Sequence, residues 1–239
     1  MAELPARERI ILAIDTSKEA DAERLARIAQ EAGARFVKLG IELSSATSWR
    51  YCSELAAGHG LDWVADAKLD DIPNTVVGAV KNIKALEHQP LGITMHATAG
   101  AEAMRTAQEE AEDIKMLAVT ILTSIEDEEV KKIYRVPVGQ KVMELARDIV
   151  AAKALGIVSS PLEVGMIKGD PETRNLFAMI PGTRSATAEH DDQARVGTPA
   201  AAIKDDADLL VIGRQITQSE DPAQAYEELV EEIEGAISG

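Results

Sequence analysis

Short runs of apolar residues alternate with longer amphipathic stretches along the whole chain. Eight of these runs have the length and the Ile, Val and Leu content of β-strands, and they cover residues 10–15, 35–39, 62–67, 91–96, 115–121, 155–159, 176–180 and 208–213. Helix-like patterns lie near residues 19–32, 44–57, 73–87, 100–110, 126–154, 194–204 and 222–236, whereas the segment 160–175 is weakly patterned. Strands that alternate with helices in this way predict parallel βαβ units.

The number and spacing of these units favour a closed barrel. No Ser/Gly-rich or Pro-rich linker divides the 239 residues, and that length is typical of a closed α/β barrel. An open, doubly wound sheet is the main alternative, but no Gly-x-Gly-x-x-Gly motif follows the first predicted strand. We therefore expect a single-domain α/β fold, a closed (β/α)8 TIM barrel over residues 1–239.

Composition narrows the possible partners. Apolar residues make up 46% of the chain and aromatic residues only 3%, so the core must consist mainly of Ala, Val, Ile and Leu. The net charge of −16 repels a nucleic-acid backbone and an anionic membrane surface. Cys52 is the only cysteine, the first residues are charged, and no run of about 18 apolar residues occurs. These features predict a cytoplasmic protein without nucleic-acid or membrane partners.

Polar residues recur where the predicted strands end. They are Asp15, Lys38, Asp66, Lys68, His96, Ser124, Ser160, Gly182 and Arg214. The active sites of (β/α)8 barrels lie at the carboxyl ends of the strands. The recurrence therefore predicts an enzyme whose active site lies at that face.

The third strand carries the densest cluster of charge. Asp66 and Lys68 are two residues apart and should project from the same face of the strand, with Asp71 just beyond and Lys38 at the end of the neighbouring strand. A lysine held by carboxylates in a partly dry pocket can deliver a proton, and the fixed charges can stabilise a carbanion. The alternative is an ordinary lattice of ion pairs at the rim of the barrel.

The last two strands predict an anion site. The eighth ends in Gly213-Arg214, and the loops after strands seven and eight of such barrels often bind phosphate. Gly213 allows backbone N–H groups to approach an anion, and Arg214 offers a planar pair of donors. The seventh strand leads into a segment rich in small and polar residues, about 182–193, which is either a lid that closes over a ligand or an ordinary surface loop.

Taken together, these motifs resemble the orotidine 5′-phosphate decarboxylase family, in its short, single-domain form, over nearly the whole chain. The motifs, in order, are Ala13-Ile14-Asp15, Val37-Lys38-Leu39-Gly40, Asp66-Ala67-Lys68-Leu69-Asp70-Asp71-Ile72-Pro73-Asn74-Thr75, Met95-His96-Ala97, Leu122-Thr123-Ser124, Pro181-Gly182, Asp192-Gln193 and Val211-Ile212-Gly213-Arg214.

The resemblance implies decarboxylation of orotidine 5′-monophosphate to UMP and carbon dioxide, the last step of UMP synthesis, without a metal or an organic cofactor. It implies that Lys68 protonates C6 and that Asp66 lies near the substrate carboxylate. Asp71, with Ile72 and Thr75 beside it, would reach into the active site of a partner subunit in a homodimer.

The same resemblance assigns the remaining contacts. Asp15 and Lys38 would hold the ribose hydroxyls, and Ser124 would contact the pyrimidine edge. His96 is either a contact near the ribose phosphate or a packed histidine at a strand end.

At the phosphate end, Pro181 would begin the lid, and Gln193 and Arg214 would bind the phosphate. Arg184 and Arg195 are either further phosphate contacts or solvated residues of the lid.

Two other functions remain open. Related barrels that act on hexulose phosphates share the Asp-x-Lys-x-x-Asp pattern but use a magnesium ion, for which Glu42 could supply an acidic ligand. The Ile72-Pro73-Asn74-Thr75 continuation, Leu122-Thr123-Ser124 and Asp192-Gln193 favour the nucleotide enzyme instead. The third possibility is an inactive barrel that senses a phosphate ligand or serves as a scaffold.

Overall fold

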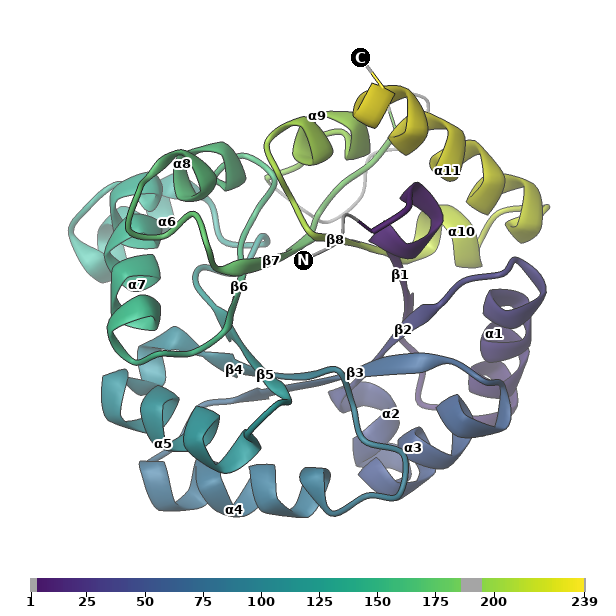
Figure 1. Ribbon diagram of the computed structural model, residues 1–239, viewed down its shortest axis with the longest axis horizontal. Coiled ribbons are helices and arrows are strands. Elements are labelled where there is room, and N and C mark those ends of the chain that lie inside the picture. The colour runs from purple at the N-terminus through teal and green to yellow at the C-terminus, as the bar shows by residue number, and fades with distance from the viewer. Residues whose placement is uncertain (1–3, 186–194, 239) are drawn as a thin grey trace.

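The predicted closed (β/α)8 barrel is confirmed. The computed structural model describes residues 4–185 and 195–238. In it eight parallel strands pair in sequence order and close on themselves, with the helices forming an outer ring (Figure 1). The strands are β1 (Ile10–Ile14), β2 (Phe36–Gly40), β3 (Asp62–Leu69), β4 (Gly92–His96), β5 (Lys115–Val119), β6 (Gly156–Val158), β7 (Phe177–Pro181) and β8 (Leu209–Ile212).

The helices follow the predicted pattern with two interruptions. They are α1 (Glu19–Glu31), α2 (Ile41–Ala46), α3 (Trp49–Gly58), α4 (Pro73–Lys84), α5 (Ala101–Ala111), α6 (Asp127–Tyr134), α7 (Val138–Ala151), α8 (Val164–Gly169), α9 (Pro199–Lys204), α10 (Arg214–Thr217) and α11 (Pro222–Ser238), with the short 3-10 helices η1 (Ala6–Arg9) and η2 (Ala97–Ala99).

Local chemistry explains both interruptions. The predicted helix at 44–57 is split because Ser48 caps the start of α3, its hydroxyl accepting a hydrogen bond from the backbone N–H of Tyr51. The predicted helix at 126–154 is split between α6 and α7, where Arg135 is left-handed with φ 64° and Pro137 is the N-cap of α7. The weakly patterned segment 160–175 contains the short helix α8.

The strands are buried on both faces, and their residues alternate between two apolar layers. In β1, Ile10, Leu12 and Ile14 pack beneath the helices, whereas Ile11 and Ala13 belong to a second cluster that fills the barrel interior. This arrangement explains why the strands read as continuous apolar runs rather than as alternating patterns.

Leu117 of β5 occupies space beside its two neighbouring strands because both begin with glycine. A β-carbon added to Gly156 would lie 2.4 Å from Cδ2 of Leu117, and one added to Gly92 would lie 2.8 Å from Cδ1. Both distances are far shorter than a van der Waals contact, so side chains there would displace the leucine.

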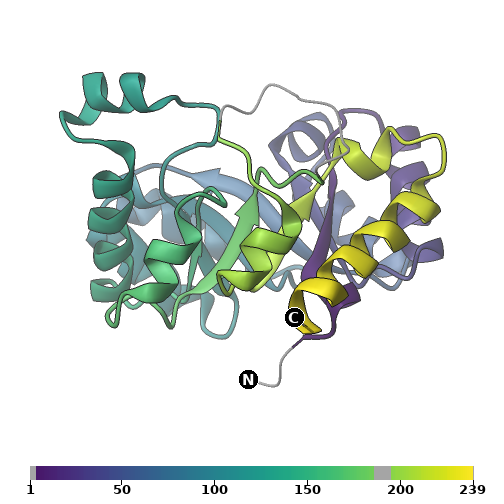
Figure 2. The same ribbon diagram turned by 90° about the horizontal axis from the view of Figure 1, so that it is seen from above.

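The two ends of the barrel differ. Figure 2 shows the teal helix α6 projecting from one edge, whereas η1, which precedes β1, lies at the opposite edge. The edge near α6 carries the carboxyl ends of the strands and is the predicted functional face. No helix within residues 4–185 and 195–238 is long and apolar enough to cross a membrane.

Candidate active site

A cavity of ≈ 470 Å³ opens at the carboxyl ends of the strands. Its apolar wall is the top layer of the barrel interior and consists of Ala13, Val119, Val158, Met179 and Val211. Its charged lining comprises Asp15, Lys38, Asp66, Lys68, Arg184 and Arg214. The volume lies in the range of small-molecule sites, and polar groups converge on an apolar surface as such sites require.

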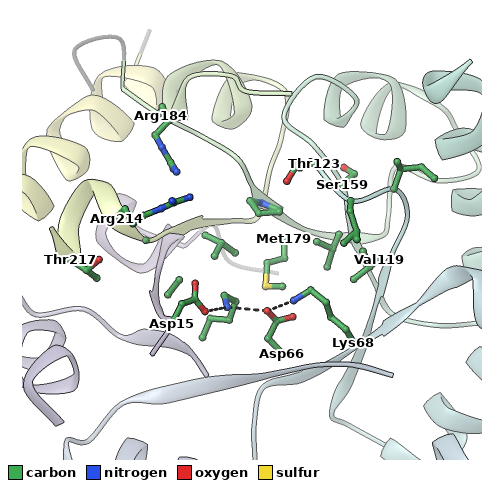
Figure 3. Close-up of a pocket in the computed structure, with 18 of the residues that line it drawn as sticks. Asp15, Asp66, Lys68, Val119, Thr123, Ser159, Met179, Arg184, Arg214 and Thr217 are labelled. Carbon is green, nitrogen blue, oxygen red and sulfur yellow. Dashed lines mark hydrogen bonds and ion pairs between the residues drawn. The ribbon is translucent and has the colours of Figure 1, made fainter. Parts of the chain in front are cut away.

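Four of these residues form an array of alternating charges. Lys38 Nζ donates to Asp15 Oδ1 at 2.8 Å and to Asp66 Oδ2 at 3.0 Å, and Lys68 Nζ donates to the same Asp66 oxygen at 2.6 Å (Figure 3). We call Asp15, Lys38, Asp66 and Lys68 the ion-pair array. It joins the ends of β1, β2 and β3, as the sequence predicted for Lys38, Asp66 and Lys68.

All four residues line the cavity, but the two in the middle of the array are more deeply buried than the two at its ends. The side chains of Lys38 and Asp66 are 10% and 8% exposed, whereas those of Asp15 and Lys68 are 57% and 31% exposed. Burial alone would raise the pKa of Asp66, but Lys38 and Lys68 outweigh it and hold that pKa well below its ordinary range. Burial would likewise lower the pKa of Lys38, but Asp66 and Asp15 raise it. Lys38 and Asp66 are therefore both charged at neutral pH.

Asp66 and Lys68 meet as predicted, but through a bulge rather than through regular strand alternation. Ala65 pairs with Ile93 and Leu69 pairs with Met95, so residues 66–68 face the single residue Thr94. Lys68 has a left-handed backbone with φ 44°, which is uncommon for a residue other than glycine. The bulge turns the Lys68 side chain back toward Asp66.

Two arginines line the cavity across from Lys68. Arg184 follows β7 and Arg214 follows β8, and Figure 3 shows both side chains on the side of the cavity away from Lys68. Gly213 also lines the cavity, so the predicted Gly213-Arg214 motif lies where a phosphate site was expected. Arg184, whose place the sequence left open, is a second cation at this end.

Arg195 has a different place. It is 6% exposed, its Nη1 donates to Glu163 Oε1 at 2.8 Å, and its Nη2 donates to the carbonyl oxygens of Ile121 at 2.9 Å and Leu122 at 3.2 Å. It does not line the cavity, and it is neither a solvated residue nor placed to meet a ligand there.

Three predicted residues at the start of α4 do not line the cavity of their own chain. Asp71, Ile72 and Thr75, at the start of α4, are exposed, and the Ile72 residue is 66% exposed. Asp71 Oδ1 accepts a hydrogen bond from the Ile72 backbone N–H at 2.7 Å. Asp71 therefore does not reach the cavity of its own chain, and its role in an active site stays a prediction.

Ser124 and His96, the predicted contacts with the pyrimidine and the ribose phosphate, both lie outside the cavity lining. Ser124 is exposed and does not line the cavity, whereas its neighbour Thr123 does. His96 is half-buried outside the cavity lining, and burial lowers its pKa. The geometry thus favours Thr123 over Ser124 and gives His96 no direct contact with the cavity.

The predicted lid can be followed only at its two ends. Pro181 lines the cavity, and Gly182 has a φ of 81°, so a glycine suits this turn out of β7. Thr183 forms a parallel bridge with Gly197, so the two ends of the loop lie side by side. Gln193 lies outside the described residues, and both its phosphate contact and the lid remain predictions.

Sequence reasoning missed Thr94, which is fully buried in β4. Its hydroxyl donates to Asp66 Oδ1 at 2.8 Å and accepts the backbone N–H of Lys68 at 2.9 Å. A polar residue within the apolar run Leu91-Gly92-Ile93-Thr94-Met95 was the available signal. Within residues 4–185 and 195–238, no three His, Cys, Asp or Glu side chains are grouped to hold a metal ion.

A closed barrel with a charged cavity at the carboxyl ends of its strands defines a (β/α)8-barrel enzyme. Residues 8–229 match the sequence model of the "Orotidine 5'-phosphate decarboxylase / HUMPS family". The chain belongs to that family.

Individual relatives agree with this assignment. The orotidine 5′-phosphate decarboxylase of Anaeromyxobacter sp. (strain K) is 40% identical over 91% of this chain and 95% of the relative. That of Synechococcus sp. (strain CC9311) is 41% identical over 92% of each protein. Among solved structures, the orotidine 5′-phosphate decarboxylase of Lactobacillus acidophilus has a TM-score of 0.80 and 29% identity, covering 95% of this chain and 99% of that one.

Proposed function

We propose that the protein decarboxylates orotidine 5′-monophosphate to UMP and carbon dioxide in pyrimidine biosynthesis, without a metal or an organic cofactor. The observation that carries the proposal is the ion-pair array, which lies across the cavity from Arg184 and Arg214. The full-length relatives named above support the substrate.

The two ends of the cavity suit the two ends of this nucleotide. Arg184 and Arg214 supply planar groups of donors for the 5′-phosphate, and Gly213 permits a close approach of the backbone. Asp15 and Lys38 hold the ribose hydroxyls, and Thr123 lies where it can contact the pyrimidine edge. Binding of the distant phosphate then contributes free energy that holds the reacting end in place.

The ion-pair array performs the chemistry at the other end. When the bond from C6 to the carboxylate breaks, its electron pair stays on C6, and Lys68 Nζ transfers a proton to that carbon. Water later returns a proton to the lysine. Asp66, which lies 2.6 Å from Lys68 Nζ, holds the ammonium group in place and presents a negative charge near the substrate carboxylate. Charges that are held in place before the reaction stabilise the transition state without reorganisation.

A second copy of this chain completes the site. Asp71, Ile72 and Thr75 are exposed at the start of α4 and do not reach their own cavity. Ile41, which follows the neighbouring strand β2, is 47% exposed. We infer a homodimer in which each cavity receives Asp71 from the partner, with Ile72 and Thr75 beside it. Exposed apolar side chains on this face favour a protein partner over solvent.

The decisive experiment follows the absorbance of orotidine 5′-monophosphate with the purified protein in the presence of EDTA. We expect full turnover, with UMP as the product. A folded sample without turnover would refute the proposal, and activity that EDTA abolishes would point to the magnesium-dependent barrels instead.

Mixing subunits tests the shared site. Asp71→Ala and Lys68→Ala subunits are each expected to be inactive alone. After subunit exchange, we expect roughly a quarter of the wild-type activity, because half of the dimers are hybrids and each hybrid has one intact site. Exchange that is verified by mass spectrometry and restores no activity would show that the site is not shared.

A further inference from the structure

Thr94 makes two hydrogen bonds to the ion-pair array without entering the cavity. Its Oγ1 donates to Asp66 Oδ1 at 2.8 Å and accepts the backbone N–H of Lys68 at 2.9 Å. The residue has no exposed surface and does not line the cavity. One hydroxyl group therefore connects the two residues that lie at the reacting end.

The β3 bulge leaves a gap in the strand ladder that this hydroxyl fills. Residues 66–68 face Thr94 alone, so the regular ladder between β3 and β4 is interrupted there. The Lys68 N–H, which would otherwise lack a partner in the ladder, is satisfied by a side chain. The left-handed backbone of Lys68 persists only where its surroundings hold it, and this hydrogen bond is part of that support.

The other hydrogen bond controls which oxygen of Asp66 meets the lysines. Thr94 occupies Oδ1, whereas both Lys38 and Lys68 donate to Oδ2. A hydroxyl group has one hydrogen to donate, and here it is directed to the carboxylate because the oxygen accepts the backbone N–H. Thr94 thereby restrains the rotation of the Asp66 carboxylate through the oxygen that the lysines do not contact.

We propose that Thr94 is a positioning residue, whose hydroxyl fixes the backbone of Lys68 and the carboxylate of Asp66 together and so aims the Lys68 ammonium group. The inference rests on the proposed function, in which that ammonium group delivers the proton. Thr94 acts through Lys68 and Asp66 and touches no reacting atom.

The test compares Thr94→Val, which keeps the shape and removes the hydroxyl, with Thr94→Ser, which keeps the hydroxyl. We expect Thr94→Val to lower kcat by about 10- to 100-fold, since small displacements of reacting groups have effects of that size. KM should change less than about threefold, because Arg184 and Arg214 still bind the phosphate. Thr94→Ser should retain kcat within about threefold of the wild type.

Thr120→Val is the matched control. Thr120 is also buried at the end of a neighbouring strand, but its hydroxyl donates to the Val158 carbonyl oxygen at 3.0 Å and not to the array. We expect wild-type kcat in this variant. If Thr94→Val does not fold, Thr94→Cys takes its place, since it matches Thr94→Ser in size and lacks a strong donor.

The outcomes separate this inference from the proposed function. Without turnover by the wild type, the proposed function fails. With wild-type turnover, the inference is overturned if folded Thr94→Val keeps kcat within about twofold, or if Thr94→Ser or Thr120→Val loses as much as Thr94→Val. A rise in KM with unchanged kcat would also overturn it, because a misplaced proton donor slows the chemical step.

Discussion

Two groups of buried charges within residues 4–185 and 195–238 differ in their access to the cavity. The ion-pair array joins β1, β2 and β3 and reaches the cavity at both ends, through Asp15 and Lys68. The buried pair, Glu163–Arg195, is sealed, with side chains that are 4% and 7% exposed. It ties Arg195, near the end of the connection from β7 to α9, to the loops after β5 and β6.

The two carboxylates in these groups titrate in opposite directions. Burial acts to raise the pKa of both, but Lys38 and Lys68 together lower that of Asp66. Glu163 has a single cation, and its pKa stays above the ordinary value because burial outweighs Arg195 and the hydrogen bonds from Ser160. Two cations outweigh the effect of burial on the pKa of Asp66, whereas one cation does not outweigh it for Glu163.

The difference distinguishes charges that can act on a ligand from charges that only stabilise the fold. Charges that end in a cavity can act on a ligand, and their mutual pairing holds them in place beforehand. Charges that are sealed beneath loops can act only on the chain itself, as Arg195 does on the carbonyl groups of Ile121 and Leu122. Removing a charge from each group should therefore have separable effects on turnover and on stability.

The largest effect is expected from removing the charge at the open end of the array. Lys68→Ala should lower kcat by at least about 10³-fold, because it removes both the proton donor and a fixed charge beside the carbanion. UMP binding, measured by calorimetry, should remain detectable. Lys204→Ala, on the exposed side of α9, is the control and should match the wild type. Near-normal turnover by Lys68→Ala would show that the proton donor has been misassigned.

The next effect concerns the sealed pair. Arg195→Met should lower the free energy of unfolding by about 3 kcal/mol or more, because Glu163 is left buried without its cation. Arg147→Met, which breaks the surface pair with Asp170 at 2.8 Å, should cost less than about 1 kcal/mol. Urea unfolding measures both.

Turnover by Arg195→Met below its unfolding midpoint should fall less than about tenfold, because no atom of Arg195 lines the cavity. Equal stability losses in the two arginine variants, or a loss of turnover as large as that of Lys68→Ala, would abolish the distinction between the two groups.

The smallest effect lies in the dependence of stability on pH. The pKa of Asp66 is lowered in the folded protein, so its contribution is present above about pH 4 and is lost as the pH falls further. The pKa of Glu163 is raised, so its contribution is largest below about pH 4 and decreases as the pH rises through the folded pKa.

Both pH dependences are tested by measuring the free energy of unfolding of the wild type, Asp66→Asn and Glu163→Gln at a series of pH values on either side of about 4. The difference between the wild type and Asp66→Asn should shrink toward acid, and that between the wild type and Glu163→Gln should grow as the pH falls toward about 4. Parallel slopes would contradict the opposite directions of the two pKa shifts.

Much of the site could be predicted because the carboxyl ends of all eight strands meet at one face of the barrel, so residues at strand ends are brought together. Asp15, Lys38, Asp66, Lys68, Gly213 and Arg214 all lie at or just beyond strand ends, and all line one cavity. The sequence was less informative in the loop that follows β5. Thr123 rather than Ser124 lines the cavity, and the alternation of apolar residues carries no information about which neighbour in a loop turns inward.

The sequence by itself determined the barrel, because each strand and helix encodes its own burial in a local pattern of apolar residues. It also determined that lysines and carboxylates meet at one end of the barrel. Only the tertiary structure decided how they meet. The bulge that aims Lys68 depends on Thr94, 26 residues away, and the inward turn of Arg195 depends on Glu163 and on Ile121, 32 and 74 residues away. Such hydrogen bonds join segments that no local pattern relates, so they are set only when the barrel closes.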